Sequence, residues 1–226
     1  RSRQAGEGGE ALQAIFGKKV FNYPKPPSLL QEILRQTTKP NDVVLDFFAG
    51  SGTTAQCVMA LNTEDGGSRR FIMVSSREST EDDDARNVCR DVCAQRLRRV
   101  IRGVPGMEPL RGDFAYLMAS RIAFEDIVYE LTPDHVWLAI QAMHDLPLQQ
   151  LDPSRDVHAG ITADDVAIVY CNKFQDGTEA ALREVIGDRC AFVYSWSIGP
   201  VKEAFRGRNG IEIRHARDEL VRRFRA

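Results

Sequence analysis

The sequence has no apolar run long enough to cross a membrane, because none reaches the roughly 18 residues that a spanning helix needs. It also lacks a signal-peptide core behind its first residues, Arg1-Ser2-Arg3-Gln4, and it begins without a methionine. We therefore expect a protein that has no membrane partner and that is processed, trimmed or excised from something longer.

The sequence also has no excess of basic residues: it contains 30 Lys and Arg and 32 Asp and Glu, which gives a formal net charge of −2. Domains that bind nucleic acid usually show a positive balance, so the total does not indicate such binding, although it leaves room for local patches. The apolar share of 43% and the charged share of 27% are typical of a globular protein. A chain of 226 residues allows one large domain or two small ones.

Paired cysteines are absent too. The five cysteines are an odd number and form no C-x-x-C pair, which predicts reduced thiols in a cytoplasmic protein. Cys89 and Cys93 can share one face of a helix, but no histidine or second cysteine pair completes a set of metal ligands. We expect these two thiols to pack in a core and predict no metal site. The four histidines have no nucleophile or carboxylate at a catalytic spacing, so none is assigned chemistry.

What the sequence does contain is an apolar run that leads into a glycine turn, Val43-Val44-Leu45-Asp46-Phe47-Phe48-Ala49-Gly50-Ser51-Gly52-Thr53-Thr54. An apolar strand, a glycine turn and the start of a helix over residues 55–61 are the parts of a cradle for a nucleotide-type ligand. Gly50 and Gly52 can adopt positive φ and let a ligand approach the backbone. A dinucleotide fingerprint needs a third glycine, and a P-loop needs a lysine after the last glycine; neither is present.

Asp46 stands near the end of the strand expected over residues 43–47, which we predict to be parallel and buried on both faces because it is apolar throughout. Doubly wound sheets bind ligands at the carboxyl ends of their strands. The Asp46 carboxylate can therefore attract a ligand ammonium group or hold the loop through hydrogen bonds; a simple helix cap is the alternative. Asp65-Gly66-Gly67 predicts the return turn, and residues 71–74 predict the second strand.

Before the loop, residues 1–11 are polar and rich in glycine, and we expect them to be mobile. Pro24-Lys25-Pro26-Pro27 forces an extended path. A helix is predicted over residues 28–34, with Ser28 and Gln31 as a capping box. Taken alone, the proline segment is a stiff linker into that helix.

Three motifs together resemble those of β-class amino-methylating DNA methyltransferases, in particular the modification subunits of type III restriction systems. The stretch from Asp46 to Thr54 is similar to their D-x-F-x-G-S-G-T-T loop, and Phe21-Asn22-Tyr23-Pro24-Lys25-Pro26 is similar to the F-x-x-P-K-P segment before it. Leu61-Asn62-Thr63-Glu64-Asp65-Gly66-Gly67-Ser68-Arg69-Arg70-Phe71-Ile72-Met73-Val74 resembles their L-N-x-E-D-G-G-x-R-R-F-I-x-V run. The resemblance covers residues 12–78 and is fainter as far as residue 124.

The resemblance implies S-adenosylmethionine as the cofactor, with the loop around its methionine part. Relatives place a ribose-binding acid just after the second strand; Ser75 occupies the nearest aligned position, and Glu78 is the candidate because type III subunits have a Glu at about that point. The implied partners are double-stranded DNA, a second copy in a homodimer and a restriction (helicase) subunit. The candidate cofactor-binding residues are Phe21, Pro24, Lys25, Pro26, Asp46, Phe48, Ala49, Gly50, Ser51, Gly52, Thr53, Thr54, Ser75 and Glu78.

One motif of the family is missing. A D/N/S-P-P-Y/F/W tetrapeptide holds the flipped base in these enzymes, whereas the one Pro-Pro pair here, Pro26-Pro27, lies between Lys25 and Ser28. In the β order this tetrapeptide precedes the F-x-x-P-K-P segment. We therefore interpret the chain as the C-terminal part of an adenine N6-methyltransferase, inactive alone and without catalytic residues; adenine rather than cytosine rests on the resemblance. The alternatives are a non-enzymatic cofactor-binding or docking module completed by another chain, and an NAD-dependent oxidoreductase, which would need a fuller glycine fingerprint.

Past the second strand, the acidic run over residues 81–84 is explained by the start of a helix over residues 85–102. That helix has an apolar side and a basic exterior, which we interpret as solvated, with DNA phosphate as the alternative contact. A third strand is expected over residues 114–117. The basic exterior comprises Arg90, Arg96, Arg98, Arg99 and Arg102.

The fold class predicted is α/β: a partial Rossmann-like methyltransferase sheet in residues 1–124, then a smaller α/β module in residues 125–226 that acts in docking. In the module, Thr132 and Pro133 begin a helix, residues 152–162 form a polar connector, and Trp137 and Trp196 are core side chains. A small parallel sheet is expected there. Its elements are strand 166–170, helix 178–186, strand 191–196, a short helix at 201–205, strand 211–213 and helix 218–224.

Overall fold

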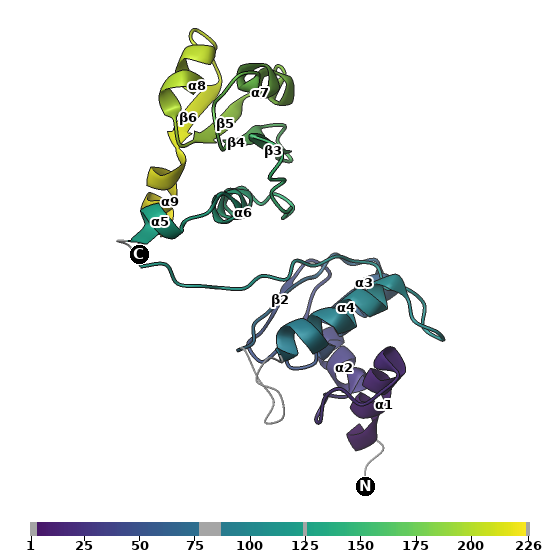
Figure 1. The fold of residues 1–226 in the computed structure, drawn as a ribbon. Coiled ribbons are helices and arrows are strands. Elements are labelled where there is room, and N and C mark those ends of the chain that lie inside the picture. Colours follow the sequence, from purple (N-terminus) through teal and green to yellow (C-terminus); the bar gives the residue numbers. More distant parts are fainter. Residues whose placement is uncertain (1–3, 77–86, 124–125, 225–226) are drawn as a thin grey trace. The chain divides into compact units, whose positions relative to one another are not determined.

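The computed structural model describes residues 4–76, 87–123 and 126–224. The chain divides into two compact units, Arg1–Met118 (unit 1) and Ala119–Ala226 (unit 2), shown in Figure 1. Each unit combines helices with a sheet, which confirms the mixed α/β class. Within the described ranges, no helix is long and apolar enough to cross a membrane.

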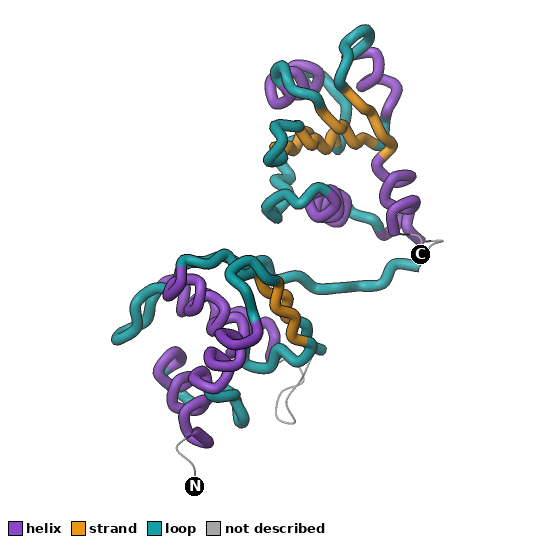
Figure 2. The backbone as a smooth tube through the Cα atoms, turned by 180° about the vertical axis from the view of Figure 1, so that it is seen from behind, coloured by secondary structure: helices purple, strands orange, loops and turns teal. Residues whose placement is uncertain are grey.

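Unit 1 is built on two parallel strands, β1 (Val43–Asp46) and β2 (Arg70–Met73), joined by helix α3 (Thr53–Asp65). Val44 pairs with Phe71, and both pack against the helices. Alternate residues point the other way, so that Val43, Leu45 and Ile72 are 45%, 50% and 53% exposed. The prediction of a strand buried on both faces is therefore wrong, because the helices among the described residues of unit 1 cover one face of the strand pair and leave these side chains of the other face exposed (Figure 2).

The described part of the N-terminal segment is helical, contrary to our expectation that residues 1–11 are mobile. Helix α1 (Gln4–Phe16) begins at Gln4. Its side chains Leu12 and Ile15 are buried in the core of unit 1, and this packing stabilises the helix. Its glycines do not prevent the helix from forming: Gly8 is buried and faces the proline segment, where a side chain has no room.

Helix α2 (Pro27–Thr37) follows the proline segment, as predicted, but the capping box is wrong. Pro26 occupies the N-cap position, so Ser28 lies inside the first turn. Its backbone N–H donates to Glu7 of α1 at 2.8 Å, and its hydroxyl donates to the same carboxylate. A side chain from another helix thus satisfies an amide that the local sequence leaves free.

The chain continues at residue 87 with a turn of π-helix, η1 (Cys89–Cys93), which runs directly into α4 (Ala94–Arg102). Helix α4 ends at Arg102, the predicted last residue of this helix, and Gly103 is its C-cap. The acidic run over residues 81–84 lies outside the described residues. Residues 114–117 form no strand in the described part of unit 1, because Phe114 packs into the helical core beneath Arg98, whose guanidinium carbon lies 5.7 Å from the ring centre.

Unit 2 contains a four-stranded sheet in the order β3-β4-β5-β6. Helices α7 and α8 cover one face of this sheet, and α6 and α9 cover the other (Figure 1). Strands β4, β5 and β6 are parallel, and β3 is antiparallel to β4. The elements are α5 (Ile127–Glu130), α6 (Pro133–Met143), β3 (Val157–Ile161), β4 (Ala167–Cys171), α7 (Thr178–Ile186), β5 (Ala191–Ser195), α8 (Ile198–Ala204), β6 (Ile211–His215) and α9 (Ala216–Phe224).

The elements expected from residue 166 onward are confirmed within a few residues at each end, but the sheet is mixed rather than parallel. The segment expected to be a polar connector includes β3, which the sequence Val157-His158-Ala159-Gly160-Ile161 does not reveal by any clear alternation. A tight turn joins β3 to β4: Thr162 N–H donates to the Val166 carbonyl at 3.0 Å, and Asp165 adopts a positive φ of 58°. Trp137 is 3% exposed and Trp196 packs against the same cluster, as predicted.

Candidate functional site

The glycine turn between β1 and α3 has the backbone that its sequence predicts. Gly50 and Gly52 adopt positive φ values of 48° and 78°, and Gly52 is the N-cap of α3. The turn is held at the end of β2, because the Ala49 N–H donates to the carbonyl of Val74, the residue after this strand, at 3.0 Å. It closes on itself through a 2.7 Å hydrogen bond from the Gly52 N–H to the Ala49 carbonyl.

Asp46 holds this turn from the end of β1. One carboxylate oxygen accepts the Phe48 N–H at 2.8 Å, and the other accepts the Thr54 hydroxyl at 2.6 Å. The carboxylate accepts no backbone N–H of α3, so it is not a helix cap. Of the two roles open to Asp46, holding the loop is the one that these hydrogen bonds support directly.

Several polar groups around the turn have no partner in the described part of the chain. The amides of Gly50 and Ser51 donate to no acceptor there. Ser75 follows Val74, whose carbonyl holds Ala49, and its hydroxyl oxygen is buried and unpaired among the described residues. Buried polar groups usually find a partner, so these are groups that a bound ligand can satisfy.

Phe21 also reaches the turn from a distant part of the sequence. A Cβ added to Gly50 would lie 3.7 Å from the Phe21 ring, and the ring packs in a cluster with Leu12, Val88 and Val92. The structure therefore brings Phe21, Asp46, the glycine turn and Ser75 together, as a shared site requires.

The remaining predicted site residues lie differently. The carbonyls of Pro24 and Lys25 face α1 at Gly8, and Pro26 begins α2. The Phe48 side chain is 89% exposed beside the turn. Glu78 lies outside the described residues.

Arg96 lies directly beneath the turn and is fully buried, which corrects its assignment to the basic exterior. Its Nε donates to Gln56 at 2.6 Å, and its Nη1 donates to the Thr53 hydroxyl at 2.7 Å and to the Ser51 hydroxyl and carbonyl at 3.1 and 3.3 Å. Burial lowers the pKa of Arg96 to about 10, so the guanidinium remains a cation at neutral pH.

A signal for this burial is present in the sequence and was missed. Arg96 stands four residues after Val92 and four before Val100, and residues at this spacing share one helix face. Both valines are buried. Arg99, by contrast, is exposed; its guanidinium lies over the Phe16 ring at 4.7 Å and donates to the Ile15 carbonyl at 3.1 Å.

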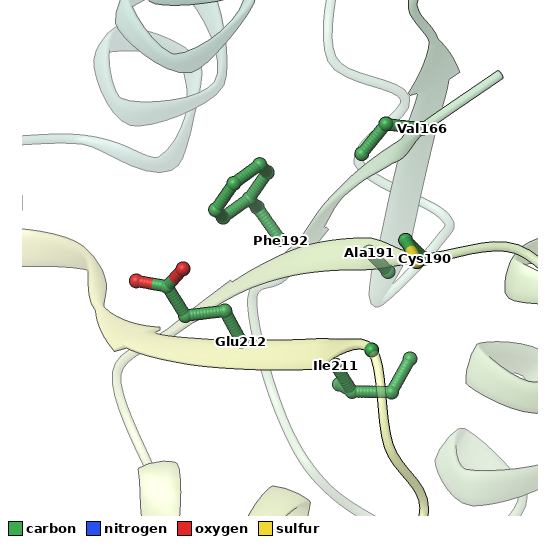
Figure 3. A pocket seen from close by; sticks show the side chains of 7 residues that line it. Val166, Cys190, Ala191, Phe192, Ile211 and Glu212 are labelled. Atoms are coloured by element: carbon green, nitrogen blue, oxygen red, sulfur yellow. The ribbon is translucent and has the colours of Figure 1, made fainter. Parts of the chain in front are cut away.

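Unit 2 has pockets of its own, one of which lies beside the start of α7, where Gly177 is the N-cap with a positive φ of 85°. Figure 3 shows a pocket at the amino ends of β5 and β6, the edge opposite to the one where parallel sheets bind ligands. Its one charged side chain is Glu212. The pocket is lined by Val166, Cys190, Ala191, Phe192, Gly210, Ile211 and Glu212.

Most thiols outside this pocket belong to the interior. Cys93 is buried, as predicted, whereas Cys89 is only partly buried. Cys57 and Cys171 are buried as well, and burial raises the pKa of Cys57 to about 11 and that of Cys93 to about 12. Such thiols stay protonated at neutral pH and are poor nucleophiles.

Unit 1 thus combines a parallel strand pair, a glycine turn with two positive φ angles and a carboxylate at the strand end, which are features that nucleotide-binding folds share. Residues 2–83 match the DNA methylase family. The N-terminal part of the chain is thus related to DNA methyltransferases, and the resemblance to type III modification subunits is confirmed by the relatives found.

Among these relatives is the StyLTI Mod subunit, of a type III restriction-modification enzyme from Salmonella typhimurium, with 39% identity over 108 residues, which are 46% of this chain and 17% of that protein. The EcoPI Mod subunit of Escherichia phage P1 is 46% identical over 67 residues, 30% of this chain and 10% of that protein. The type II methyltransferase M.KpnI of Klebsiella pneumoniae is 50% identical over 65 residues, 29% of this chain and 16% of that protein. The chain spans less than a fifth of the length of each of these three relatives.

Proposed function

We propose that this chain is the cofactor-binding part of an S-adenosylmethionine-dependent DNA adenine N6-methyltransferase of a restriction-modification system. The observation that supports it best is the glycine turn that Asp46 holds, since it combines unpaired amides with a carboxylate at the end of a parallel strand. The relatives of the same stretch are named as modification subunits and methyltransferases. In this proposal β1 and β2 are two strands of a Rossmann-like sheet.

The residues suit this cofactor in charge and shape. Asp46 would attract the ammonium group of the methionine part, and the Gly50 and Ser51 amides would hold its carboxylate. The unpaired Ser75 hydroxyl would donate to the adenosine part, with Glu78 as the candidate for the ribose. Phe21 closes one side of the cradle against Gly50. When bound, the cofactor supplies an activated methyl group.

The proposal divides the work between two regions, residues 1–124 for the cofactor and residues 125–226 for docking. The intact protein would act on double-stranded DNA as a homodimer with a restriction (helicase) subunit, and therefore in the cytoplasm. Because the sequence has no D-P-P-Y-like tetrapeptide, this chain alone is expected to transfer no methyl group. Incubation with labelled cofactor and mixed-sequence DNA tests this, and label in the DNA above a control without protein would contradict it.

Calorimetry tests the cofactor itself. We expect the chain to bind S-adenosylhomocysteine and not NAD, because the turn lacks the third glycine of a dinucleotide site. Asp46→Ala should abolish binding, and Arg102→Gln, which changes an exposed side chain of α4, should not. Preference for NAD would overturn the proposal.

A non-enzymatic module completed by another chain is the second candidate. The exposed apolar face of the strand pair, with Val43, Leu45 and Ile72, is the observation that favours it. In that case the cofactor would bind with normal affinity, but no added DNA-recognition segment would restore transfer to DNA.

A further inference from the structure

The π-helical turn η1 and helix α4 press on the glycine turn from its inner side. A Cβ added to Gly52 would lie 2.8 Å from the Sγ of Cys93, the last residue of η1. Arg96 follows three residues later and lies against Ser51 and Thr53. One helix face therefore fixes both ends of the segment Ser51–Thr53, whose outer side belongs to the ligand cradle.

The charge of Arg96 is unusual for this position. The Arg96 side chain is fully buried, yet all its hydrogen-bond partners within the described part of unit 1 are neutral. Its Nη2 has no partner among the described residues. A buried cation costs free energy unless an anion compensates it.

The place of this cation shows which ligand group gains from it. The guanidinium lies behind the first residues of α3, where the partial positive charge of the helix N-terminus already favours anions. The Gly50 and Ser51 amides have no acceptor in the described chain. Electrostatic attraction is strong in such a buried setting, so a carboxylate at these amides gains more from Arg96 than a neutral group does.

We propose that Arg96 is a positioning residue that fixes the glycine turn from behind and makes the start of α3 selective for ligands that have a carboxylate. The inference rests on the proposed cofactor site, since the carboxylate is that of the amino-acid part of an adenosyl-sulfur compound. Arg96 touches the loop and not the ligand, and its effect reaches the ligand through its charge and through the Ser51 and Thr53 positions that it sets.

The test compares two ligands on the full chain by calorimetry: S-adenosylhomocysteine and its decarboxylated analogue, which keeps the adenosine, the thioether and the amine. The wild type is expected to prefer the ligand with the carboxylate. Arg96→Gln should reduce this preference by at least about tenfold, which corresponds to about 1.4 kcal/mol. Arg96→Lys keeps the charge and should retain most of the preference. Arg102→Gln, on the exposed side of the same helix, should leave the ratio unchanged.

The outcomes separate the two proposals. If the wild type binds neither ligand, the cofactor site is wrong and the role of Arg96 falls with it. If the wild type shows the preference and Arg96→Gln weakens both ligands by the same factor, Arg96 is only structural and the inference alone is overturned. If Arg96→Gln does not fold, Arg96→Lys serves as the test. This variant retains the charge, so loss of its preference for the ligand with the carboxylate would contradict the proposal.

Discussion

The backbone of Gly8 in α1 lies directly against the carbonyl of Pro24, so that a methyl group on Gly8 would be 2.2 Å from the Pro24 oxygen and 2.9 Å from the Lys25 oxygen. These contacts join α1 to the proline segment, whose Phe21 reaches the glycine turn. Helix α1 thus supports the candidate cofactor site through the proline segment.

Two neighbouring glycines of α1 should therefore respond in opposite ways to the same substitution. Gly9→Ala has open space and should raise the free energy of unfolding by about 0.5–1 kcal/mol, the usual gain of Ala over Gly inside a helix. Gly8→Ala should lower it, because the backbone of Pro24 has to move. Chemical unfolding followed by circular dichroism measures both, and a stabilised Gly8→Ala variant would refute the close approach.

The two functions of Asp46 can be separated by Asp46→Asn. An asparagine can still accept the Phe48 N–H and can donate to the Thr54 hydroxyl, so the free energy of unfolding should change by less than about 1 kcal/mol. Affinity for S-adenosylhomocysteine should fall about tenfold, because a charge-assisted bond to the ammonium group becomes a neutral one. Affinity for 5′-methylthioadenosine, which has no ammonium group, should not change.

Thr54→Val is the matched control for that experiment. It keeps the carboxylate and removes one hydrogen bond of the loop, which should cost about 0.5–1.5 kcal/mol of stability. The preference for S-adenosylhomocysteine over 5′-methylthioadenosine should survive. Equal ligand affinities in Asp46→Asn and the wild type would show that Asp46 holds the loop and nothing more.

Unit 2 should lose stability in mild acid because of His144. Burial lowers the pKa of His144, the charges of Arg214 and Arg223 lower it further, and Glu219 opposes them. Near pH 6.5 the unfolded state therefore binds a proton at this histidine more readily than the folded state does. The contribution of His144 to the free energy of unfolding is complete above about pH 6.5 and is lost as the pH falls through the pKa of the folded state. Burial also lowers the pKa of His158, which adds to the same slope.

Both tryptophans lie in unit 2, so tryptophan fluorescence follows the unfolding of that unit alone. Urea unfolding at about pH 5 and about pH 7.5 should show a smaller free energy of unfolding at the lower pH. His144→Gln can still bond the Tyr194 hydroxyl, which His144 meets at 2.7 Å, and should reduce the difference. If the two free energies of unfolding differ as much in His144→Gln as in the wild type, groups other than His144 cause the pH dependence.

Binding of duplex DNA by this chain should depend on α4 and not on unit 2. The isolated residues 125–226 should show negligible binding in a gel-shift titration. Any binding by the full chain should weaken in the double variant Arg98→Glu, Arg102→Glu, which spares the buried Arg96. If six phosphates were contacted, affinity would fall roughly 10³-fold between about 50 and 200 mM salt. Salt-sensitive, sub-micromolar binding by residues 125–226 alone would contradict this assignment.

The sequence was most informative where local chemistry decides the structure. The glycine turn, the return turn at Gly66, the start of α6 and both ends of α7 follow from residues that act on their own neighbours, and they could be predicted. Helix α1 could not be, because its stability comes from Leu12 and Ile15, which pack on partners that lie far away in the sequence. The capping of Ser28 by Glu7 is hidden for the same reason.

The strand β1 shows a different limit. Its residues are apolar on both faces, which predicts that other elements pack on both sides. The pattern does not indicate whether those packing partners belong to the same unit. The burial of Arg96 was readable from its spacing to Val92 and Val100, but the five arginines of the helix favoured an exterior face. Its acceptors, Gln56 and Thr53, lie 40 or more residues earlier and give no local signal.

The uncovered side of the strand pair has a practical consequence for handling the protein. Val43, Leu45, Ile72 and Val74 place an apolar surface in water while unit 1 is fully folded. A hydrophobic dye such as anilinonaphthalene sulfonate, whose brightness is normally taken to mark a partly unfolded state, should fluoresce with the native chain. A dye-based melting curve would therefore begin bright and misreport unit 1, and a ligand that reduces the dye signal would not thereby be shown to stabilise the fold.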